Sequence, residues 1–261
     1  GKAYDNLLPA IIEGRPALSL TYVGPGREAA CIRDDWWREA ARHLSEIDLY
    51  DIDERALQAG KRGFATLDTL PPLTPIRTHR LDITSGLGDA CIQIIDHAAD
   101  DQIFADLDAC IMAHEPRRSS IGMQRPIHKT SGLAISEMVL GATGMAVFER
   151  LRARLAKVRS SLHPDDLFQL RAGFHSRIAK DHLSWLADLI DPGDVCILAT
   201  ETSVSYGSGE IYPTFDRPLS AMMTDAGFGI HRRFDGIWVD VPSGPERHSH
   251  AVSVWHLLRE H

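Results

Sequence analysis

Two elements constrain the fold of this chain most. The first is a short apolar strand that runs into a glycine turn, and the second is an apolar strand that ends in an acid. The first strand is expected at 17–23, before the turn 24–26, and the second at 46–51. The turn and the end of the second strand lie 25 positions apart, which leaves room for a helix and a returning strand. Apolar residues recur near helical spacing across 28–44. We therefore predict a strand–helix–strand unit with two parallel strands.

The residues at the ends of these two strands are typical of a nucleoside-binding site. Gly24 and Gly26 have no Cβ, so the backbone can approach a ligand closely, and the following helix directs its N-terminal N–H groups toward that ligand. Asp51 ends the second strand, where its carboxylate can accept hydrogen bonds from a ribose diol. The alternative is an ordinary strand–helix–strand unit with an accidental pair of glycines.

The rest of the chain alternates between expected strands and expected helices. Further strands are expected at 76–81, 107–113, 195–200, 231–241 and 249–258, and helices at 4–13, from 53 onward, and at 89–99, 174–189 and 218–226. This order predicts an α/β fold with a Rossmann-like, doubly wound, mostly parallel seven-stranded sheet and a C-terminal antiparallel hairpin. We expect a single domain, 1–261, with a helical insertion at about 117–172 after strand four.

A strongly helical stretch, 133–158, belongs to the expected insertion and has a basic face. Its apolar residues fall on one side, and the other side carries most of Arg150, Arg152, Arg154, Lys157 and Arg159. This face indicates either an anion-binding or dimerising helix, or the solvated face of a helix packed on the core. We also expect 117–130 to be a mobile lid, because it is polar and contains few apolar residues.

Charge and composition argue against several classes of function. The net charge of −8 and a pI near 5.9 disfavour broad nucleic-acid binding. No apolar run approaches the roughly 20 residues that a membrane span needs. The four cysteines form no Cys-x-x-Cys pair and fit reduced thiols in a cytoplasmic protein. His248 and His250 are a possible chelate, but the 13 histidines show no usual ligand spacing, so we expect no metal.

This order of elements, with these residues at the strand ends, resembles the class I S-adenosylmethionine-dependent methyltransferases. The resemblance covers nearly the whole chain except the insertion, and it implies S-adenosyl-L-methionine as the cofactor. It places the cofactor against the first glycine turn, the end of strand two and the end of strand three. The cofactor-binding residues that it implies are Tyr22, Gly24, Pro25, Gly26, Asp51, Ile52, Asp82 and Ile83. Pro192, Gly193 and Asp194 look like the turn that precedes the family's fifth strand.

Two residues depart from the family pattern. The family's acid in strand one often holds the amino group of the cofactor, and Tyr22 stands in its place. The usual third glycine of the loop is Glu28, which either takes over that contact or stabilises the first turn of its helix through the dipole.

Candidate residues for chemistry follow the expected strands four and five. His114 is the candidate general base, because its unperturbed pKa is near 6.5 and it follows strand four, with Glu115 beside it to orient the ring or an amine. The alternative is a histidine bonded to a nearby carbonyl. The acceptor pocket is expected to contain Glu201, Ser203, Tyr206 and Tyr212, with Trp238 as a further candidate.

The leading hypothesis is a small-molecule methyltransferase that acts on N, O or C. A second possibility is attack on the aminocarboxypropyl arm of the same cofactor with release of methylthioadenosine, by a transferase or an azetidine-2-carboxylate-type cyclase. A non-catalytic cofactor-binding protein is a third. An NAD-dependent dehydrogenase is a fourth, although the turn lacks the full Gly-x-Gly-x-x-Gly spacing. The expected partner is a small molecule, with neither nucleic acid nor membrane, and the sequence leaves the acceptor and the oligomeric state open.

Overall fold

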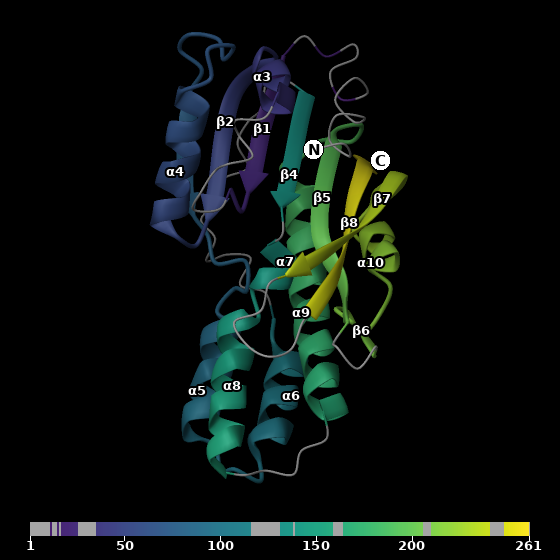
Figure 1. The fold of residues 1–261 in the computed structure, drawn as a ribbon. Helices are drawn as coiled ribbons and strands as arrows, with labels where there is room; N and C mark the ends of the chain where they lie inside the picture. Colours follow the sequence, from purple (N-terminus) through teal and green to yellow (C-terminus); the bar gives the residue numbers. More distant parts are fainter. Residues whose placement is uncertain are drawn as a thin grey trace.

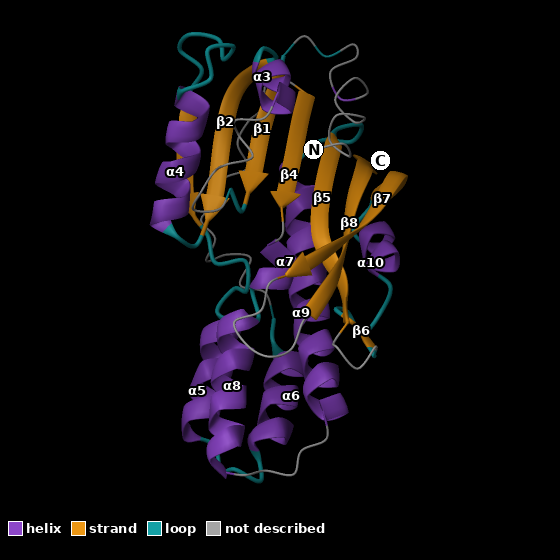
Figure 2. Ribbon diagram, viewed as in Figure 1, coloured by secondary structure: helices purple, strands orange, loops and turns teal. Residues whose placement is uncertain are grey.

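One eight-stranded sheet organises the protein. The computed structural model describes residues 11, 15, 17–25, 35–115, 131–137, 139–158, 164–205, 210–240 and 248–260. The strand order is β3-β2-β1-β4-β5-β8-β7, and β6 pairs with β5 outside this path (Figure 1). Helices cover both faces of the sheet, and a group of helices continues beyond one of its edges (Figure 2).

The first five strands are parallel and the last strands are antiparallel. The parallel strands are β1 (Leu18–Val23), β2 (Leu44–Asp51), β3 (Ile76–Arg80), β4 (Ser131–Glu137) and β5 (Val195–Ser205). The hairpin of β7 (Phe228–Asp240) and β8 (His248–Arg259) lies antiparallel beside β5, and so does the short β6 (Ile211–Pro213). The predicted Rossmann-like, mostly parallel sheet with a C-terminal antiparallel hairpin is therefore confirmed, and β6 is an additional strand.

The helices form two layers and a separate group. Their bounds are α3 Asp35–Ala41, α4 Glu54–Ala65, α5 Leu87–His97, α6 Ile103–Ala113, α7 Val139–Ala142, α8 Met145–Val158, α9 Pro164–Leu189 and α10 Leu219–Asp225. Helices α3 and α4 pack on one face of the sheet, and α9 packs on the other. Helices α5, α6 and α8 lie beyond the C-terminal ends of β1, β2 and β4 (Figure 1). Among the described helices, none combines the length and the apolar character needed to cross a membrane.

Two apolar cores follow from the alternation of side chains along the buried strands. One core lies under α3 and α4 and contains Tyr22, Trp37 and Phe64. The other lies under α9 and continues into α5, α6 and α8. Successive residues of a strand point to opposite faces, so the central strands β1, β2, β4 and β5 supply side chains to both cores.

The expected fourth strand at 107–113 is wrong, because this segment belongs to helix α6. Its buried residues Ile103, Leu107 and Ile111 recur every four positions, which is helical spacing. A short apolar run that is buried on both sides does not reveal by its pattern whether it is helix or strand. The fourth strand is β4, within the stretch that we expected to be helical.

Small residues explain why β4 is hard to recognise in the sequence. Gly132 lies so close to the turn before β5 that a Cβ there would come 2.6 Å from Oδ2 of Asp194. Ala134 and Ser136 are also fully buried. Such residues have little strand propensity, and the pairing of β4 with both β1 and β5 overrides that preference.

Other local expectations are confirmed. Asp53 caps α4, since its side chain accepts a hydrogen bond from the backbone N–H of Arg55 at 2.9 Å. Gly227 follows α10 with φ +81°. The expected helix at 28–44 is confirmed over α3 but ends before Leu44, where β2 begins.

Helices α7, α8 and α9 follow the fourth strand, as expected. The single-domain division with an insertion at about 117–172 stays a prediction. The expected helix at 4–13 apart from Ile11, as well as Gly26, Glu28, Tyr206 and the lid at 117–130, lie outside the described residues.

Candidate active site

The ends of β2, β1 and β4 bring the first group of predicted site residues to one edge of the sheet. These strands are neighbours and run in the same direction, so their last residues lie side by side. Asp51 ends β2, Gly24 follows β1, and Glu137 ends β4. The sequence analysis placed Asp51 and Gly24 correctly at this edge, but it missed Glu137 because it placed strand four elsewhere.

Gly24 is required by its backbone and by its close neighbours. Its φ is +75°, and its N–H donates to the carbonyl oxygen of Tyr50 at 2.9 Å. A Cβ at this position would come 2.3 Å from Cγ2 of Val139, at the start of α7. The glycine therefore lets the turn after β1 pass the segment that follows β4. Pro25 is buried beside Gly60 of α4.

Tyr22 links two strand ends through its hydroxyl group. The ring is fully buried and stacks on Trp37 with a centroid distance of 5.3 Å. Its hydroxyl donates to Oε2 of Glu137 at 2.6 Å. A short hydrogen bond to an ionised carboxylate is among the stronger ones in proteins, so Tyr22 holds the carboxylate of Glu137 at the sheet edge.

Asp51 stands at the tip of β2, where it was predicted. Its Oδ1 accepts a hydrogen bond from the backbone N–H of Asp53 at 2.9 Å, and its side chain is partly buried. This contact fixes the turn between β2 and α4. The next residue, Ile52, is 56% exposed. An acid and an exposed apolar side chain therefore stand together at this edge.

Asp82 and Ile83 follow β3 and shape the turn into α5. Oδ1 of Asp82 accepts from the N–H and the hydroxyl of Thr84 at 2.9 and 2.7 Å, and Oδ2 accepts from the N–H of Gly86 at 2.9 Å. Ile83 packs against the core under α9. Asp82 thus has a structural role in this turn that the sequence pattern did not reveal.

His114 and Glu115 are not at a strand tip, so the reason for choosing them is wrong. His114 is the residue that ends α6, and its carbonyl oxygen accepts a hydrogen bond from Arg177 of α9. Glu115 is the next residue and lies beyond the end of α6. Both residues come before β4 in the chain, whereas the prediction required them to come directly after the fourth strand.

The second group of predicted residues lies where β5 extends past the sheet edge. The last residue of β4, Glu137, pairs with Ala199, and β5 continues to Ser205. Glu201 lies in this extension and is only 6% exposed. Ser203 pairs with Pro213 of β6.

Two tyrosines and a tryptophan were also expected in this region. Tyr212 stacks on Phe168 of α9 with a centroid distance of 3.6 Å, and its hydroxyl donates to Glu210 at 2.7 Å. Tyr206 lies outside the described residues. Trp238 pairs in register with His250 in the β7–β8 hairpin.

Glu201 is the centre of a buried polar cluster. Its Oε1 accepts from Nη2 of Arg171 at 3.1 Å and from the hydroxyl of Thr214 at 2.9 Å. Its Oε2 lies 2.5 Å from Nδ1 of His250. The sequence could not reveal this cluster, because its members come from α9, β5, the segment after β6, and β8.

Two further histidines are buried side chains of α9, His175 and His182. Burial lowers the pKa of His182 to about 3, and its Nε2 lies 2.8 Å from the hydroxyl oxygen of Ser136. Burial, with a smaller contribution from the charge of Arg171, lowers the pKa of His175 to about 3. Both rings are therefore neutral near pH 7. In the described part of the chain, no group of three or more His, Cys, Asp or Glu is arranged to hold a metal ion.

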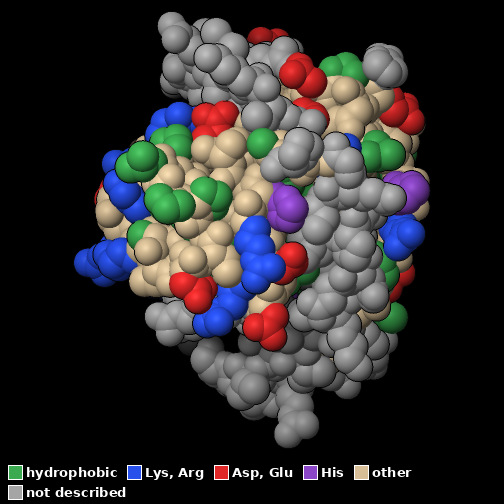
Figure 3. Space-filling model, turned by 90° about the horizontal axis from the view of Figure 1, so that it is seen from above, with side chains coloured by type: hydrophobic (Ala, Val, Ile, Leu, Met, Phe, Trp, Pro, Cys, Tyr) green, Lys and Arg blue, Asp and Glu red, His purple; other side chains and the backbone are tan. Residues whose placement is uncertain are grey.

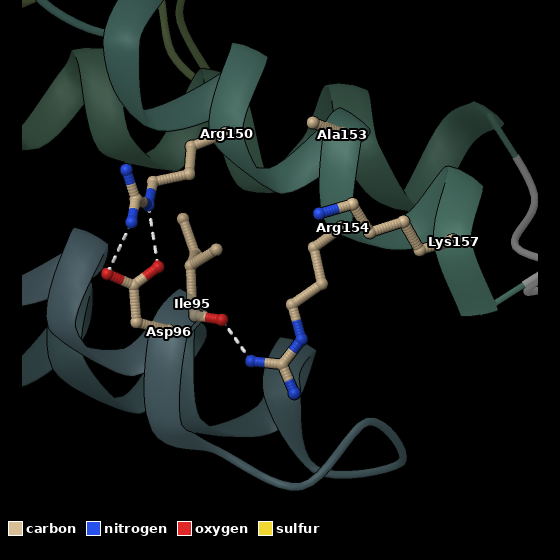
Figure 4. A pocket seen from close by; sticks show the side chains of 6 residues that line it. All are labelled: Ile95, Asp96, Arg150, Ala153, Arg154 and Lys157. Atoms are coloured by element: carbon tan, nitrogen blue, oxygen red, sulfur yellow. Dashed lines mark hydrogen bonds and ion pairs between the residues drawn. The ribbon is translucent and has the colours of Figure 1, made fainter.

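A separate pocket of about 510 Å³ lies between α5 and α8, and the basic face of α8 lines it (Figure 4). Arg150 donates to both carboxylate oxygens of Asp96 at 2.6 and 2.7 Å, and this hydrogen bonding lowers the pKa of Asp96. Arg154 donates to the carbonyl oxygen of Ile95 and to Asp100. These two arginines hold α8 against α5, so their charges are already matched within the protein.

The surface seen from above mixes charges of both signs. Acidic and basic side chains lie interspersed there among apolar ones, without a continuous basic stripe among the described residues (Figure 3).

Comparisons with known proteins find similar solved structures. No protein-family model matches this sequence, and none of the curated proteins is significantly similar to it. A protein of Bacillus halodurans C-125 described as a methyltransferase is 8% identical, with 100% of both chains covered and a TM-score of 0.49.

Two other solved structures are similar along nearly their whole length. The N-methyltransferase NodS of Bradyrhizobium japonicum WM9 is 8% identical over 100% of this chain and 96% of its own, with a TM-score of 0.44. A methyltransferase of Mesorhizobium loti that depends on S-adenosylmethionine is 12% identical over 97% of this chain and 96% of its own, with a TM-score of 0.42. The strand order and the C-terminal antiparallel hairpin by themselves identify a Rossmann-like fold.

Proposed function

We propose that this protein binds S-adenosyl-L-methionine and transfers its methyl group to N, O or C of a small molecule. The proposal rests on one observation: β2, β1 and β4 end next to one another, and Asp51, Gly24 and Glu137 lie at these ends. Ligands of open parallel sheets bind outside the carboxyl ends of the strands, at the point where the strand order reverses. Here that point lies between β1 and β4, since β1 pairs with β2 on one side and with β4 on the other.

The residues at this edge fit the chemical groups of that cofactor. Asp51 offers a carboxylate to the ribose hydroxyls, and Ile52 and Ile83 offer apolar surface to the adenine ring. Gly24 and Pro25 belong to the turn on which the methionine part would lie, and Gly26 belongs to the same proposal. Asp82 and Tyr22 remain in the proposed site, the first beside the adenine and the second through its bond to Glu137.

Glu137 offers a carboxylate that can replace the acid that the family has at the position of Tyr22. The family's acid in strand one is absent, and the hydroxyl of Tyr22 positions a carboxylate from β4 at the same edge. We infer that Glu137 binds the ammonium group of the cofactor in place of that acid. When bound, the cofactor supplies an electrophilic methyl group, and the chain's own residues orient the acceptor and exclude water.

The substrate-facing wall is proposed to be the extension of β5 with β6. Glu201, Ser203 and Tyr212 stand there, and Tyr206 belongs to the same proposal. His114 and Glu115 were candidates for catalysis because they were expected to follow strand four. That reason no longer holds, since β4 is 131–137. The acidic net charge of −8 favours a small molecule over nucleic acid as the acceptor, and a cytoplasmic location remains our expectation.

The runner-up is attack on the aminocarboxypropyl arm of the same cofactor. Tyr22 favours this alternative, because the changed contact to the amino end could alter how the arm is held. The two reactions release different nucleosides, so one measurement distinguishes them.

The test has a binding arm and a product arm. Calorimetry should show that the purified protein binds S-adenosyl-L-methionine and S-adenosyl-L-homocysteine more tightly than NAD. Mass spectrometry after incubation with acceptor mixtures should detect S-adenosyl-L-homocysteine. Methylthioadenosine would instead support attack on the arm, and tighter binding of NAD would overturn the proposal.

A further inference from the structure

The extension of β5 forms a wall beside the proposed cofactor site. Pairing between β4 and β5 ends at Glu137 and Ala199, so Glu201 lies two residues past the sheet edge, roughly 7 Å at the usual rise of a strand. The register with β8 shifts between Glu201 and Ser203. Such a bulge redirects a side chain, and bulges are frequent next to active sites. The wall therefore places Glu201 just beyond the sheet edge at which the cofactor is proposed to bind.

The carboxylate of Glu201 is held by three donors. Arg171 and Thr214 donate to Oε1, and His250 donates to Oε2 at 2.5 Å. A buried carboxylate is stable only when it is paired and hydrogen-bonded, and here both oxygens are engaged. Arg171 also neutralises the charge of the carboxylate, so the cluster has little capacity left to bind a cationic amine.

This arrangement determines the protonation pattern of His250. An ionised carboxylate only accepts hydrogen bonds, so the hydrogen between the two groups belongs to Nδ1 of His250. With the hydrogen on Nδ1, the lone pair of the imidazole is on Nε2. The side chain of His250 is 20% exposed, and Nε2 has no hydrogen-bond partner among the described residues. A carboxylate that orients a histidine in this way also stabilises the imidazolium that forms when Nε2 takes a proton.

We propose that His250 is the general base of the reaction and that the acceptor is a hydroxyl group of a phenol or an alcohol. The inference rests on the proposed methyl transfer. In that step the acceptor oxygen forms a bond to the methyl carbon as the sulfur–methyl bond breaks, which leaves a neutral thioether. The hydroxyl proton goes to Nε2 of His250 and later to water. Glu201 is a positioning residue, because it acts through His250.

A hydroxyl acceptor fits this cluster better than the other classes. A phenol titrates near pH 10 and an alcohol higher still, so both gain from a base that removes the proton during transfer. A thiol ionises more readily, and a neutral amine can attack before it loses a proton. The buried cluster has no unmatched carboxylate that would favour an ammonium group.

The experiment compares three variants of the cluster and one control variant with the wild-type protein. Turnover is measured as release of S-adenosyl-L-homocysteine with catechol, hydroxybenzoate and hexanol, and with benzylamine and thiophenol for comparison. His250→Gln keeps a polar partner for Glu201 but has no titratable base. We expect it to lower kcat with a hydroxyl acceptor at least about 100-fold, which is the low end for general-base catalysis, while the Kd for S-adenosyl-L-methionine changes less than about threefold. His97 is an exposed residue of α5, and His97→Gln is the matched control, which should leave both kcat and the Kd unchanged.

Two further measurements separate catalysis from a folding defect. Added imidazole should restore turnover to His250→Ala, which a merely structural role does not allow. Nitrogen NMR should place the hydrogen of His250 on Nδ1 in the wild type, and Glu201→Gln should mix the two tautomers. This spectroscopic readout needs neither cofactor nor acceptor.

The outcomes distinguish this inference from the proposed function. A wild-type protein that binds S-adenosyl-L-methionine but turns over no hydroxyl acceptor overturns the hydroxyl inference alone. The role of His250 is overturned if His250→Gln matches the wild type, or if the hydrogen resides on Nε2. A wild-type protein that binds neither sulfur nucleoside overturns the proposed function, and the inference with it.

Discussion

At the scale of single residues, the predicted site depends on two positions that have separate physical roles. Asp51 combines a structural hydrogen bond to the N–H of Asp53 with a carboxylate at the sheet edge. Gly24 combines a left-handed backbone with close packing against Val139. A substitution at Asp51 should therefore affect mainly binding, and one at Gly24 mainly folding.

We expect Asp51→Ala to weaken the binding of S-adenosyl-L-homocysteine more than tenfold. The change removes hydrogen bonds between a charged group and the ribose hydroxyls, which contribute roughly 1.5–3 kcal/mol each. Calorimetry measures the Kd, and circular dichroism checks the fold. Asp108→Ala, on the exposed side of α6, is the matched control. An unchanged Kd in a folded variant would remove Asp51 from the site.

We expect Gly24→Ala to lower the free energy of unfolding by about 2–5 kcal/mol. A left-handed backbone costs a residue with a Cβ roughly 1–2 kcal/mol, and a Cβ 2.3 Å from Val139 adds overpacking of about 1–3 kcal/mol. Urea unfolding measures the loss. Gly173→Ala is the control, because a Cβ added there would meet no neighbouring atom within 4 Å and alanine favours the helix α9. Equal stability of the two variants would contradict the packing argument.

At the scale of elements, pairs of side chains hold strands and helices in register. Arg150 joins α8 to α5 through Asp96, whereas Tyr22 joins β1 to the end of β4 through Glu137. The first pair is exposed to water and contributes little. The second is partly buried, and its loss leaves a carboxylate without one of its donors.

We expect Tyr22→Phe to destabilise the protein by roughly 1.5–3 kcal/mol, the usual range for a hydrogen bond to a charged group. It should also weaken binding of S-adenosyl-L-methionine, because Glu137 is no longer held at the edge. Thermal unfolding and calorimetry measure the two effects. Tyr212→Phe is the matched control for stability, since it removes a similar bond of 2.7 Å to Glu210 that is exposed. Equal losses in the two variants would show that burial is unimportant here.

At the scale of the whole molecule, α9 buries two histidines that must stay neutral. The pKa values of His175 and His182 are lowered to about 3, mainly by burial. The unfolded chain binds protons at these groups near pH 6.5, and the folded chain does not. The contribution to stability is therefore complete above pH 6.5 and is lost progressively as the pH falls toward 3.

We expect the free energy of unfolding to fall by about 1.4 kcal/mol per pH unit for each of these histidines between pH 6 and 4. His182→Gln should remove one such contribution and make the profile less steep, whatever its stability at pH 7. Urea unfolding at several pH values measures the slope. His97→Gln, at an exposed position of α5, should keep the wild-type slope. An unchanged slope in His182→Gln would mean that the ring accepts a proton while the protein is folded.

The sequence by itself determined the features that depend on neighbouring residues. The apolar runs of β1 and β2, the cap at Asp53 and the glycine at 227 are local features, because each can be recognised within a few positions of the sequence. The order of these elements also indicated a parallel sheet with a final hairpin. Asp51 and Gly24 could be placed at its edge on this basis alone.

Only the tertiary structure decided the features that join distant segments. The apolar run in α6 was expected to be a strand and is a helix, whereas the small residues of β4 were expected to be helical and form a strand. Pairing of β4 with β1 and β5 outweighs its local propensity. Tyr22 meets Glu137, and Glu201 meets His250, across more than 40 positions in each case. No spacing in the sequence reveals such pairs, because strand order and register bring them together. For this reason the proposed cofactor edge was predictable from the chain, whereas the candidate base appeared only in the folded molecule.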